Sequence, residues 1–429
     1  MQGNIIQVEE RVPLGKGIAL SLQHMFAMFG ASVLVPILFG INPGVVLLMN
    51  GIGTLLFILI TKGKAPAYLG SSFAFLSPVF MIMGAGATQD ASRYPLALGG
   101  FVVVGLVICV VALLIRLFGT KWIDVILPPA AMGPVVALIG LTLAGTAAKS
   151  GGLPVPGVEL ATIDYHNVIV FCITLLTAIF GSILFKKFLA VIPILISIVV
   201  GCIVAALFGQ FHIDQTLTHQ IFILPQFQTP QFDLAAIAII LPAALVIVTE
   251  HIGHQMVTGK IVDRDLIKDP GLHRTLLSDG ISTALSGFVG SVPTTTYGEN
   301  IGVMAITKVY SVWVIGGAAV ISIVVAFIGP VSAVIQAIPW SVIGGVSFML
   351  YGMIAASGLR LLVEAKVDYS KSRNLALTSV VLVTGLSGAY IPISASFNLE
   401  GLPLSTIIGM VLGIIFWLLD KAKLTNDRD

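Results

Sequence analysis

The chain has 429 residues, of which 57% are hydrophobic and only 10% are charged, and its formal net charge is +2. Soluble domains carry about 25% charged residues, so the composition excludes an ordinary soluble protein. Continuous apolar runs, rather than short stretches of alternating polarity, exclude a transmembrane barrel. The chain is therefore predicted to be an all-α polytopic membrane protein.

Fourteen membrane segments are predicted, because each apolar run comes close to the ~20 residues that a spanning helix needs. Of the 22 Lys and Arg residues, 20 fall in loops on the side of the two termini, and only Arg93 and Lys149 fall on the other side. The positive-inside rule then predicts cytoplasmic termini. The predicted segments are residues 17–40, 44–61, 66–84, 95–118, 129–148, 165–185, 189–208, 233–256, 274–291, 293–309, 310–329, 339–358, 372–392 and 404–420.

Two halves of the chain resemble each other weakly. Gly99-Gly100 corresponds to Gly316-Gly317, residues 127–145 to 338–358, and residues 70–78 to 297–305. Seven segments per half is an odd number, so the halves are predicted to form a 7+7 inverted repeat, which is typical of transporters. Chance similarity between Gly-rich and Ala-rich apolar segments is the alternative.

The third and tenth segments are interrupted. Each follows a proline, opens with residues that favour extended backbone, and then places a glycine before polar groups, in Gly70-Ser71-Ser72 and Gly298-Glu299-Asn300. Extended backbone inside a membrane must pair or line a cavity. We therefore predict two short antiparallel strands that meet at the midplane. Each strand leads into a half-helix whose N-terminus points at one common site.

Ionisable residues within the predicted segments are candidate functional groups, because a charge at the bilayer centre costs about 2.5–3.5 kcal/mol on insertion scales. The tenth segment contains Glu299, and the eighth contains Glu250, His251 and His254. Glu250 and His254 are four residues apart and so share a helix face. The sequence leaves open which histidine faces the site, and also whether Glu250 and His254 form only a helix-end pair.

Other polar and aromatic residues are open to more than one interpretation. Gln23 and His24 lie in the first segment, where His24 could simply be packed against neighbouring backbone. Asp279 and Asp124 lie about one turn from basic residues and are predicted to be interfacial or structural. Phe73 and Tyr351 could stack on a flat ligand or belong to the core. Cys109, Cys172 and Cys202 stand in apolar runs at no metal-like spacing, so we predict buried thiols and no metal or cofactor.

The candidate groups together favour a neutral, planar solute. Two carboxylates would repel an anion but accept N–H bonds, while helix N-termini would donate to carbonyl oxygens. Glutamate and histidine can also take up and release a proton, which makes proton coupling plausible.

Short motifs over essentially the whole chain resemble one family. "ENIGVMAITK" (299–308) resembles the signature of the nucleobase–ascorbate transporters, and the Gln-His pair at 23–24 resembles the pair in that family's first span. "GSSFAF", "PPAAMG", "TEHIGH", "DPGLHR" and "TTYGENIG" look like the uracil permease branch. At the position of Glu299-Asn300 in this chain, the purine carriers of the family look like Gln-Asn instead. The glutamate therefore favours a pyrimidine as the substrate.

The resemblance implies proton-driven uracil import across the bacterial inner or plasma membrane. Uracil, protons and the lipid bilayer would be the partners, with a homodimer possible and no nucleic acid. It implies a core domain of residues 1–120 and 231–330 and a gate domain of residues 121–230 and 331–429. The implied substrate contacts are Glu250, Glu299, Phe73, Ser72, Tyr297, Gly298 and Tyr351, with Glu250 and His254 in proton coupling and Gln23, His24 and Asn300 supporting them.

Three rival interpretations remain from the sequence. A purine nucleobase carrier or a sulfate or bicarbonate carrier could share the architecture, although an anion carrier would suit a basic or neutral residue at position 250 or 299. An intramembrane metalloprotease is disfavoured, because "EHIGH" lacks the His-Glu-x-x-His order that such enzymes use.

Overall fold

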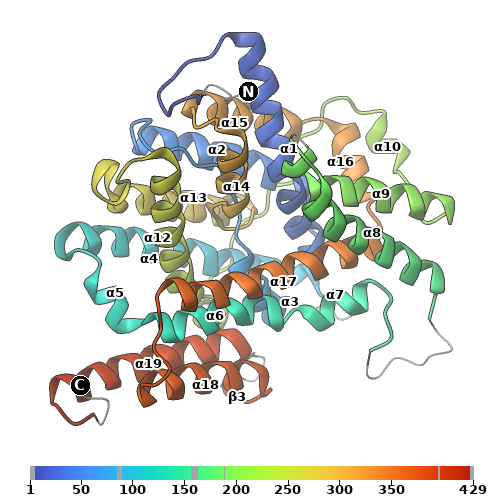
Figure 1. Ribbon diagram of the computed structural model, residues 1–429. Coiled ribbons are helices and arrows are strands. Elements are labelled where there is room, and N and C mark those ends of the chain that lie inside the picture. Colours follow the sequence, from blue (N-terminus) through green and yellow to red (C-terminus); the bar gives the residue numbers. More distant parts are fainter. Residues whose placement is uncertain (1–4, 85–88, 156–162, 188, 395–396, 426–429) are drawn as a thin grey trace.

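The computed structural model describes residues 5–84, 89–155, 163–187, 189–394 and 397–425, and these residues are mostly helical (Figure 1). The helices of the first half are α1 (Leu14–Phe39), α2 (Pro43–Ile60), α3 (Leu76–Met83), α4 (Tyr94–Phe118), α5 (Lys121–Ile126), α6 (Pro129–Leu141), α7 (Ala144–Ser150), α8 (Tyr165–Leu184), α9 (Pro193–Leu207) and α10 (Gln215–Thr218). Those of the second half are α11 (Leu234–Ile240), α12 (Ala243–Val262), α13 (Leu272–Val289), α14 (Gly298–Thr307), α15 (Val312–Ala326), α16 (Gly329–Gln336), α17 (Trp340–Glu364), α18 (Ser372–Leu386) and α19 (Gly401–Lys421).

Within the described residues, eight helical stretches are long and apolar enough to cross a membrane, and four shorter apolar helices accompany them. The prediction of a multi-pass helical membrane protein is thus confirmed, whereas the count of fourteen segments stays a prediction. The predicted eighth segment consists of two helices, α11 and α12. They are separated at Leu241 and Pro242, where the proline has no N–H to continue the hydrogen-bond ladder.

The two predicted strands are confirmed. Strand β1 (Leu69–Ser71) pairs antiparallel with β2 (Thr294–Thr296), in the register Leu69 to Thr296 and Ser71 to Thr294. Each strand leads directly into a half-helix: β1 into the 3-10 turn η1 (Phe73–Phe75) and α3, and β2 into α14. The ten residues of α14 span about 15 Å, which is half of a hydrocarbon core, so α14 is too short to cross a membrane by itself.

A second pair of strands was not predicted. Strand β3 (Tyr390–Ser394) pairs antiparallel with β4 (Phe397–Glu400) between α18 and α19. The predicted thirteenth segment, residues 372–392, is therefore wrong at its end, because α18 stops at Leu386. The run "YIPIS" is as apolar as a helix end, but its β-branched residues and proline favour extended backbone.

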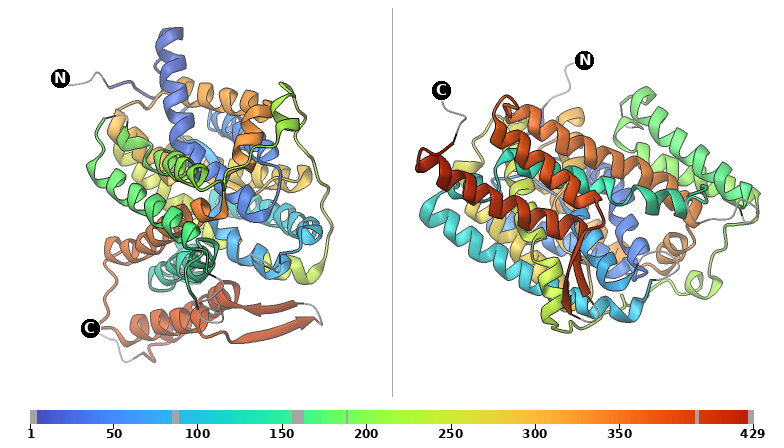
Figure 2. Two further views of the ribbon diagram at one scale, coloured as in Figure 1. Left: turned by 90° about the vertical axis from the view of Figure 1, so that its right-hand side faces the viewer. Right: turned by 90° about the horizontal axis from the view of Figure 1, so that it is seen from below.

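The helices pack in two groups. In the first group, α1, α2, α4, α13 and α15 contact one another, and α4 and α13 share the closest interface. Gly105 permits this approach, because a methyl group in place of its hydrogen would lie 2.4 Å from the backbone nitrogen of Ala284. In the second group, α6 and α17 contact each other and are flanked by α8, α9, α18 and α19, which lie to one side of the first group in Figure 2.

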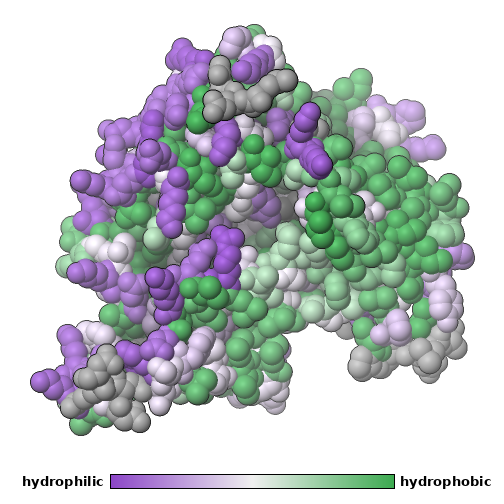
Figure 3. All heavy atoms as spheres, in the orientation of Figure 1, coloured by the Kyte–Doolittle hydropathy of each residue, from purple (hydrophilic) through white to green (hydrophobic). Residues whose placement is uncertain are grey.

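The surface carries broad apolar areas. In Figure 3 the hydrophobic residues cover the right-hand part over α8 and α9, while hydrophilic residues gather on the left and top. Leu176, Phe180, Ile183 and Ile203 on these two helices are exposed, as expected of lipid-facing side chains. Cys172 on α8 is exposed too, and Cys109 and Cys202 are half-buried, so the prediction of three buried thiols is wrong. The exposed thiol of Cys172 lies on the same helix as the lipid-facing residues Leu176 and Phe180.

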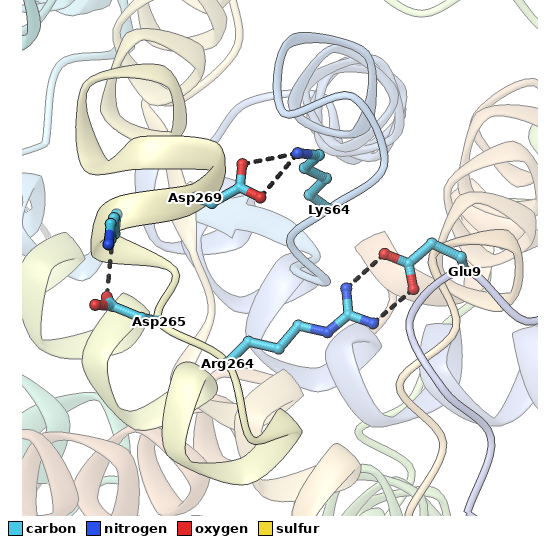
Figure 4. A pocket seen from close by; sticks show the side chains of 6 residues that line it. Glu9, Lys64, Arg264, Asp265 and Asp269 are labelled. Atoms are coloured by element: carbon cyan, nitrogen blue, oxygen red, sulfur yellow. Dashed lines mark hydrogen bonds and ion pairs between the residues drawn. The ribbon is translucent and has the colours of Figure 1, made fainter.

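The N-terminal strap, residues 5–12, ties the chain start to the end of α14. Ile6 donates to the carbonyl of Lys308 and accepts from the N–H of Tyr310, both at 3.0 Å or less, and the side chain of Val8 is fully buried. Glu9 accepts two hydrogen bonds from Arg264, and Lys64 binds Asp269 at 2.8 Å (Figure 4). These ion pairs line a pocket of about 410 Å³.

Candidate substrate-binding site

Glu250, His254 and Glu299 lie on two helices that pack against each other beside strand β2. Glu250 and His254 lie in the middle of α12, which continues to Val262, so the helix-end interpretation of this pair is wrong. Glu299 lies in the first turn of α14. Helix α12 packs against α14, β2 and η1. The packing therefore brings together the two helices that carry these three side chains.

The structure separates the roles of the two histidines. Nδ1 of His254 lies 3.2 Å from the hydroxyl of Thr296 in β2. A methyl group placed on Gly298 would lie 3.4 Å from Nε2 of His254, so this ring faces the start of α14. His251 points away from that point, into the interface with α13, and is fully buried. His254 is therefore the histidine of the site.

His251 belongs to a buried network with Asp279. Nδ1 of His251 lies 2.8 Å from the Asp279 carboxylate, and Nε2 lies 2.8 Å from the hydroxyl of Thr275. The hydroxyl of Thr295 in β2 donates to the same oxygen of Asp279 at 3.0 Å. Asp279 was predicted to be interfacial or structural, and because it is fully buried the interfacial interpretation is wrong. The sequence signal for Asp279 was an acidic residue within a predicted membrane segment. Its partner, His251, could not be found from residue spacing alone.

The antiparallel pairing of β1 and β2 places the starts of the two half-helices at opposite ends of one short strand pair. The N–H of Ser72 donates to the carbonyl of Pro293 at 2.9 Å, and the N–H of Tyr297 donates to the carbonyl of Tyr68 at 3.1 Å. The Tyr297 ring lies on Gly70, where a methyl group would come within 2.3 Å of ring carbons. These contacts fix Ser72 at one end of the strand pair and Tyr297 at the other.

Ser72 and Phe73 form the other side of this junction. The Ser72 side chain is buried, and its hydroxyl has no hydrogen-bond partner among the residues that the structure describes. Phe73 is half-buried and packs against both of the large hydrophobic clusters. A polar group that is buried without a partner is unusual, and it suits a position that a ligand completes.

Asn300 fixes α14 to the first helix. Its side-chain nitrogen lies 3.1 Å from Nδ1 of His24, and its oxygen accepts from the N–H of Tyr68 at 3.3 Å. His24 is fully buried, so its partner is this amide rather than neighbouring backbone, and the packed-histidine interpretation is corrected in that respect. Gln23, beside it on α1, is half-buried.

Tyr351 lies on α17, in the second group of helices. Its side chain is buried, and its hydroxyl has no hydrogen-bond partner in the described part of the chain. Its backbone carbonyl packs on α6, where a methyl group added to Gly140 would lie within 1.9 Å of the oxygen. A contact between Tyr351 and a ligand stays a prediction.

Known proteins resemble this chain along its length. The model of a permease family, designated Xan_ur_permease, matches residues 15–394. The chain belongs to this permease family. It is accordingly a membrane transporter and not an enzyme.

Relatives with assigned names share much of the sequence. The uracil permease of Paenibacillus larvae is 53% identical over 428 residues, which cover 100% of both chains. The uracil permease of Escherichia coli K12 is also 53% identical, over 99% of this chain and 96% of that protein. The uracil permease of Bacillus subtilis is 46% identical, over 93% of this chain and 92% of that protein.

Solved structures share the fold. The murine Slc26a9 anion transporter in its inward-facing state has a TM-score of 0.71 at 11% identity, over 96% of this chain and 69% of that one. The transmembrane domain of the cyanobacterial bicarbonate transporter BicA has a TM-score of 0.61 at 15% identity, over 96% of this chain and 99% of that one. At these identities the likeness concerns the fold alone.

Proposed function

We propose that the protein is a secondary active transporter that imports uracil in symport with protons. The observation that carries the proposal is the packing of α12, which carries Glu250 and His254, against α14, whose first turn carries Glu299. The relatives named uracil permeases, at 46–53% identity over nearly the full chain, support uracil as the substrate.

The chemistry of the site suits a pyrimidine. The ring N–H groups of uracil can donate to the carboxylates of Glu250 and Glu299, and hydrogen bonds to charged groups are worth about 1.5–3 kcal/mol. Its carbonyl oxygens can accept from backbone N–H groups at the starts of η1 and α14, where helix dipoles favour negative partial charge. Phe73 and Tyr297 can cover the faces of the ring.

Glu250 and His254 are the proposed proton-coupling groups. They lie one turn apart on α12, which packs against the helix that carries Glu299, so adding a proton to one of these acids reduces unfavourable charge in a membrane interior. A site that holds uracil and one extra proton carries less charge, and it can therefore cross the hydrophobic layer more easily.

Two moving parts accompany this mechanism. The core domain would comprise residues 1–120 and 231–330 and carry the site, and the gate domain would comprise residues 121–230 and 331–429 and supply Tyr351. The two packing groups of helices follow this division. The distribution of Lys and Arg supports cytoplasmic termini in a bacterial inner or plasma membrane.

A carrier of anions is the alternative that the fold allows, since the structural neighbours include anion and bicarbonate transporters. The pair of glutamates opposes it, because two carboxylates would repel an anion at close range. A purine differs from uracil mainly in its second, fused ring. A purine carrier is therefore tested by competition between uracil and a purine.

Uptake of radiolabelled uracil into vesicles with purified protein tests the proposal. Accumulation above the external concentration is expected when the outside is acidic, and only equilibration is expected without a pH gradient. An excess of unlabelled uracil should compete, and bicarbonate, sulfate or xanthine should not. Uptake that ignores the pH gradient would remove proton coupling, and competition by bicarbonate or xanthine would change the substrate.

A further inference from the structure

The buried His251–Asp279 pair lies next to the proposed site and is separated from His254 by Thr296. Both side chains are fully buried and come from different helices, His251 from α12 and Asp279 from α13. Neither faces the start of α14, so neither is placed to touch a ligand. Burying two ionisable groups is expensive unless they are paired, and such an arrangement inside a membrane calls for a functional reason.

The hydrogen bonds around His251 settle where its protons lie. The hydroxyl of Thr275 donates its only hydrogen to the carbonyl of Leu272 at 3.0 Å, so it can only accept from Nε2 of His251. Nε2 therefore carries a hydrogen. The remaining contact, between Nδ1 and the carboxylate of Asp279, holds one shared proton, which makes the pair neutral overall. In either form of the pair, Nδ1 is engaged by Asp279.

Thr296 connects this pair to His254. Its hydroxyl lies 3.2 Å from Nδ1 of His254 and 3.4 Å from Nδ1 of His251. Because Asp279 already engages Nδ1 of His251, the hydroxyl hydrogen of Thr296 can go only to Nδ1 of His254. Thr296 is buried, so the other choice would leave that hydrogen without an acceptor among these groups.

We propose that His251 and Asp279 are positioning residues, which act through the hydroxyl of Thr296 to hold His254 as the Nε2–H tautomer facing the substrate site. Nε2 is the atom nearest to Gly298, so its hydrogen points to the start of α14. A donor there recognises a carbonyl oxygen of the ligand, directly or through water. The proposal deepens the proposed function and rests on it for the identity of that ligand.

The opposite protonation of His254 makes the proposal sharp. With a hydrogen on Nδ1, as in the other tautomer or in a doubly protonated ring, His254 would donate to the hydroxyl of Thr296, whose own hydrogen would then need another acceptor. Only the Nε2–H tautomer satisfies the hydroxyl of Thr296. The tautomer of His254 in the protein without substrate therefore decides between the two arrangements.

Nitrogen-15 spectra of histidine-labelled full-length protein in lipid nanodiscs give the direct test, with the His254 signals assigned by their loss in His254→Gln. The neutral Nε2–H pattern is expected in the wild type. Thr296→Val should add a substantial Nδ1–H population, and Thr296→Ser should restore the wild-type pattern because it keeps the hydroxyl. Thr294→Val is the matched control, since it removes a buried hydroxyl of the same strand that contacts Ser282 instead.

Calorimetry with uracil gives the second measurement. Thr296→Val and Asp279→Asn should each weaken binding about three- to tenfold, which is the effect of one misdirected hydrogen bond. Thr296→Ser and Thr294→Val should stay within about twofold of the wild type on the same scale.

The positioning proposal and the proposed function can be disproved independently of each other. A wild-type His254 that is Nδ1–H or doubly protonated, or a tautomer unchanged in Thr296→Val, overturns the positioning proposal even if uracil binds. If the wild type does not bind uracil, the proposed function fails, and the spectra still decide the tautomer because they need no substrate.

Discussion

Glu299 is the residue whose environment most directly indicates function. It is half-buried in the first turn of a helix that begins inside the membrane. The positive end of the helix dipole stabilises a carboxylate there and pays part of the desolvation cost. A carboxylate at this position can accept hydrogen bonds from a ligand.

Replacing Glu299 by Ala is expected to weaken uracil binding by about one to two decades, since a charged acceptor worth about 1.5–3 kcal/mol is lost. Calorimetry on the purified variant measures this directly. Glu364→Ala is a useful control, because Glu364 is an exposed glutamate at the end of α17 that pairs with Arg360. Unchanged affinity in Glu299→Ala would rule out its part in recognition.

Glu250 is expected to act in coupling as well as in binding. Glu250→Gln mimics the protonated side chain, so the variant should still exchange uracil for uracil in counterflow. It should lose accumulation driven by a pH gradient, because no proton can leave the amide.

Counterflow and gradient-driven uptake in the same Glu250→Gln vesicles provide the comparison. If gradient-driven accumulation persists at the wild-type level, Glu250 is not the proton carrier, and the role passes to His254 or Glu299. Loss of both activities with a normal folded protein would assign Glu250 to binding alone.

At the scale of elements, the N-terminal strap supports the half-helix that carries Glu299. It pairs with the backbone on both sides of Val309, just after α14 ends, and Glu9 joins it to the residues that follow α12 through Arg264. The hydrogen bond from Arg264 holds the pKa of Glu9 below its usual value. The strap thereby links the ends of both helices that form the site.

Glu9→Gln is expected to lower stability slightly at neutral pH, by about 0.2–1 kcal/mol, because the ion pair is largely exposed. A group with a lowered pKa stabilises the fold above its ordinary titration range and loses that contribution as the pH falls through the folded value. The difference from the wild type should therefore disappear in acid.

Thermal unfolding at several pH values, with hydrogen exchange of residues 5–12, measures this effect. Glu10→Gln is the matched control, since the neighbouring Glu10 accepts only from the N–H of Gln7 within the strap. Equal effects of the two substitutions would mean that the ion pair does not anchor the strap.

At the scale of the whole molecule, the proposed mechanism would require the two groups of helices to move past each other. Helices α1 and α9 meet across this boundary at Gly30 and Ile194. A Cβ placed on Gly30 would lie 3.4 Å from the Cβ of Ile194, close to the separation found in disulfides.

A disulfide between Gly30→Cys and Ile194→Cys, in a protein without Cys109, Cys172 and Cys202, is therefore expected to stop transport and to spare uracil binding. Reduction should restore uptake. Each single cysteine variant, treated with the same oxidant, controls for packing damage. Full uptake by the cross-linked protein would show that these helices do not need to separate.

The sequence by itself determined the class of the protein and the two interrupted segments, and it singled out the candidate residues of the site. These features follow from local properties: apolar length, extended-backbone preference before a glycine, and the high cost of a charge in a membrane. A cost of that kind marks Glu299 or Glu250 regardless of what surrounds it.

Only the tertiary structure decided which groups meet. His251 and His254 are three residues apart, and the spacing cannot tell which faces the site, because the answer depends on where α13 and β2 pack around α12. From the sequence Asp279 could be interfacial or structural, because Arg274 lies about one turn away, yet His251 of α12 covers it. Partners of this kind come from distant parts of the chain, so their pairing is a property of the packed fold rather than of any local pattern.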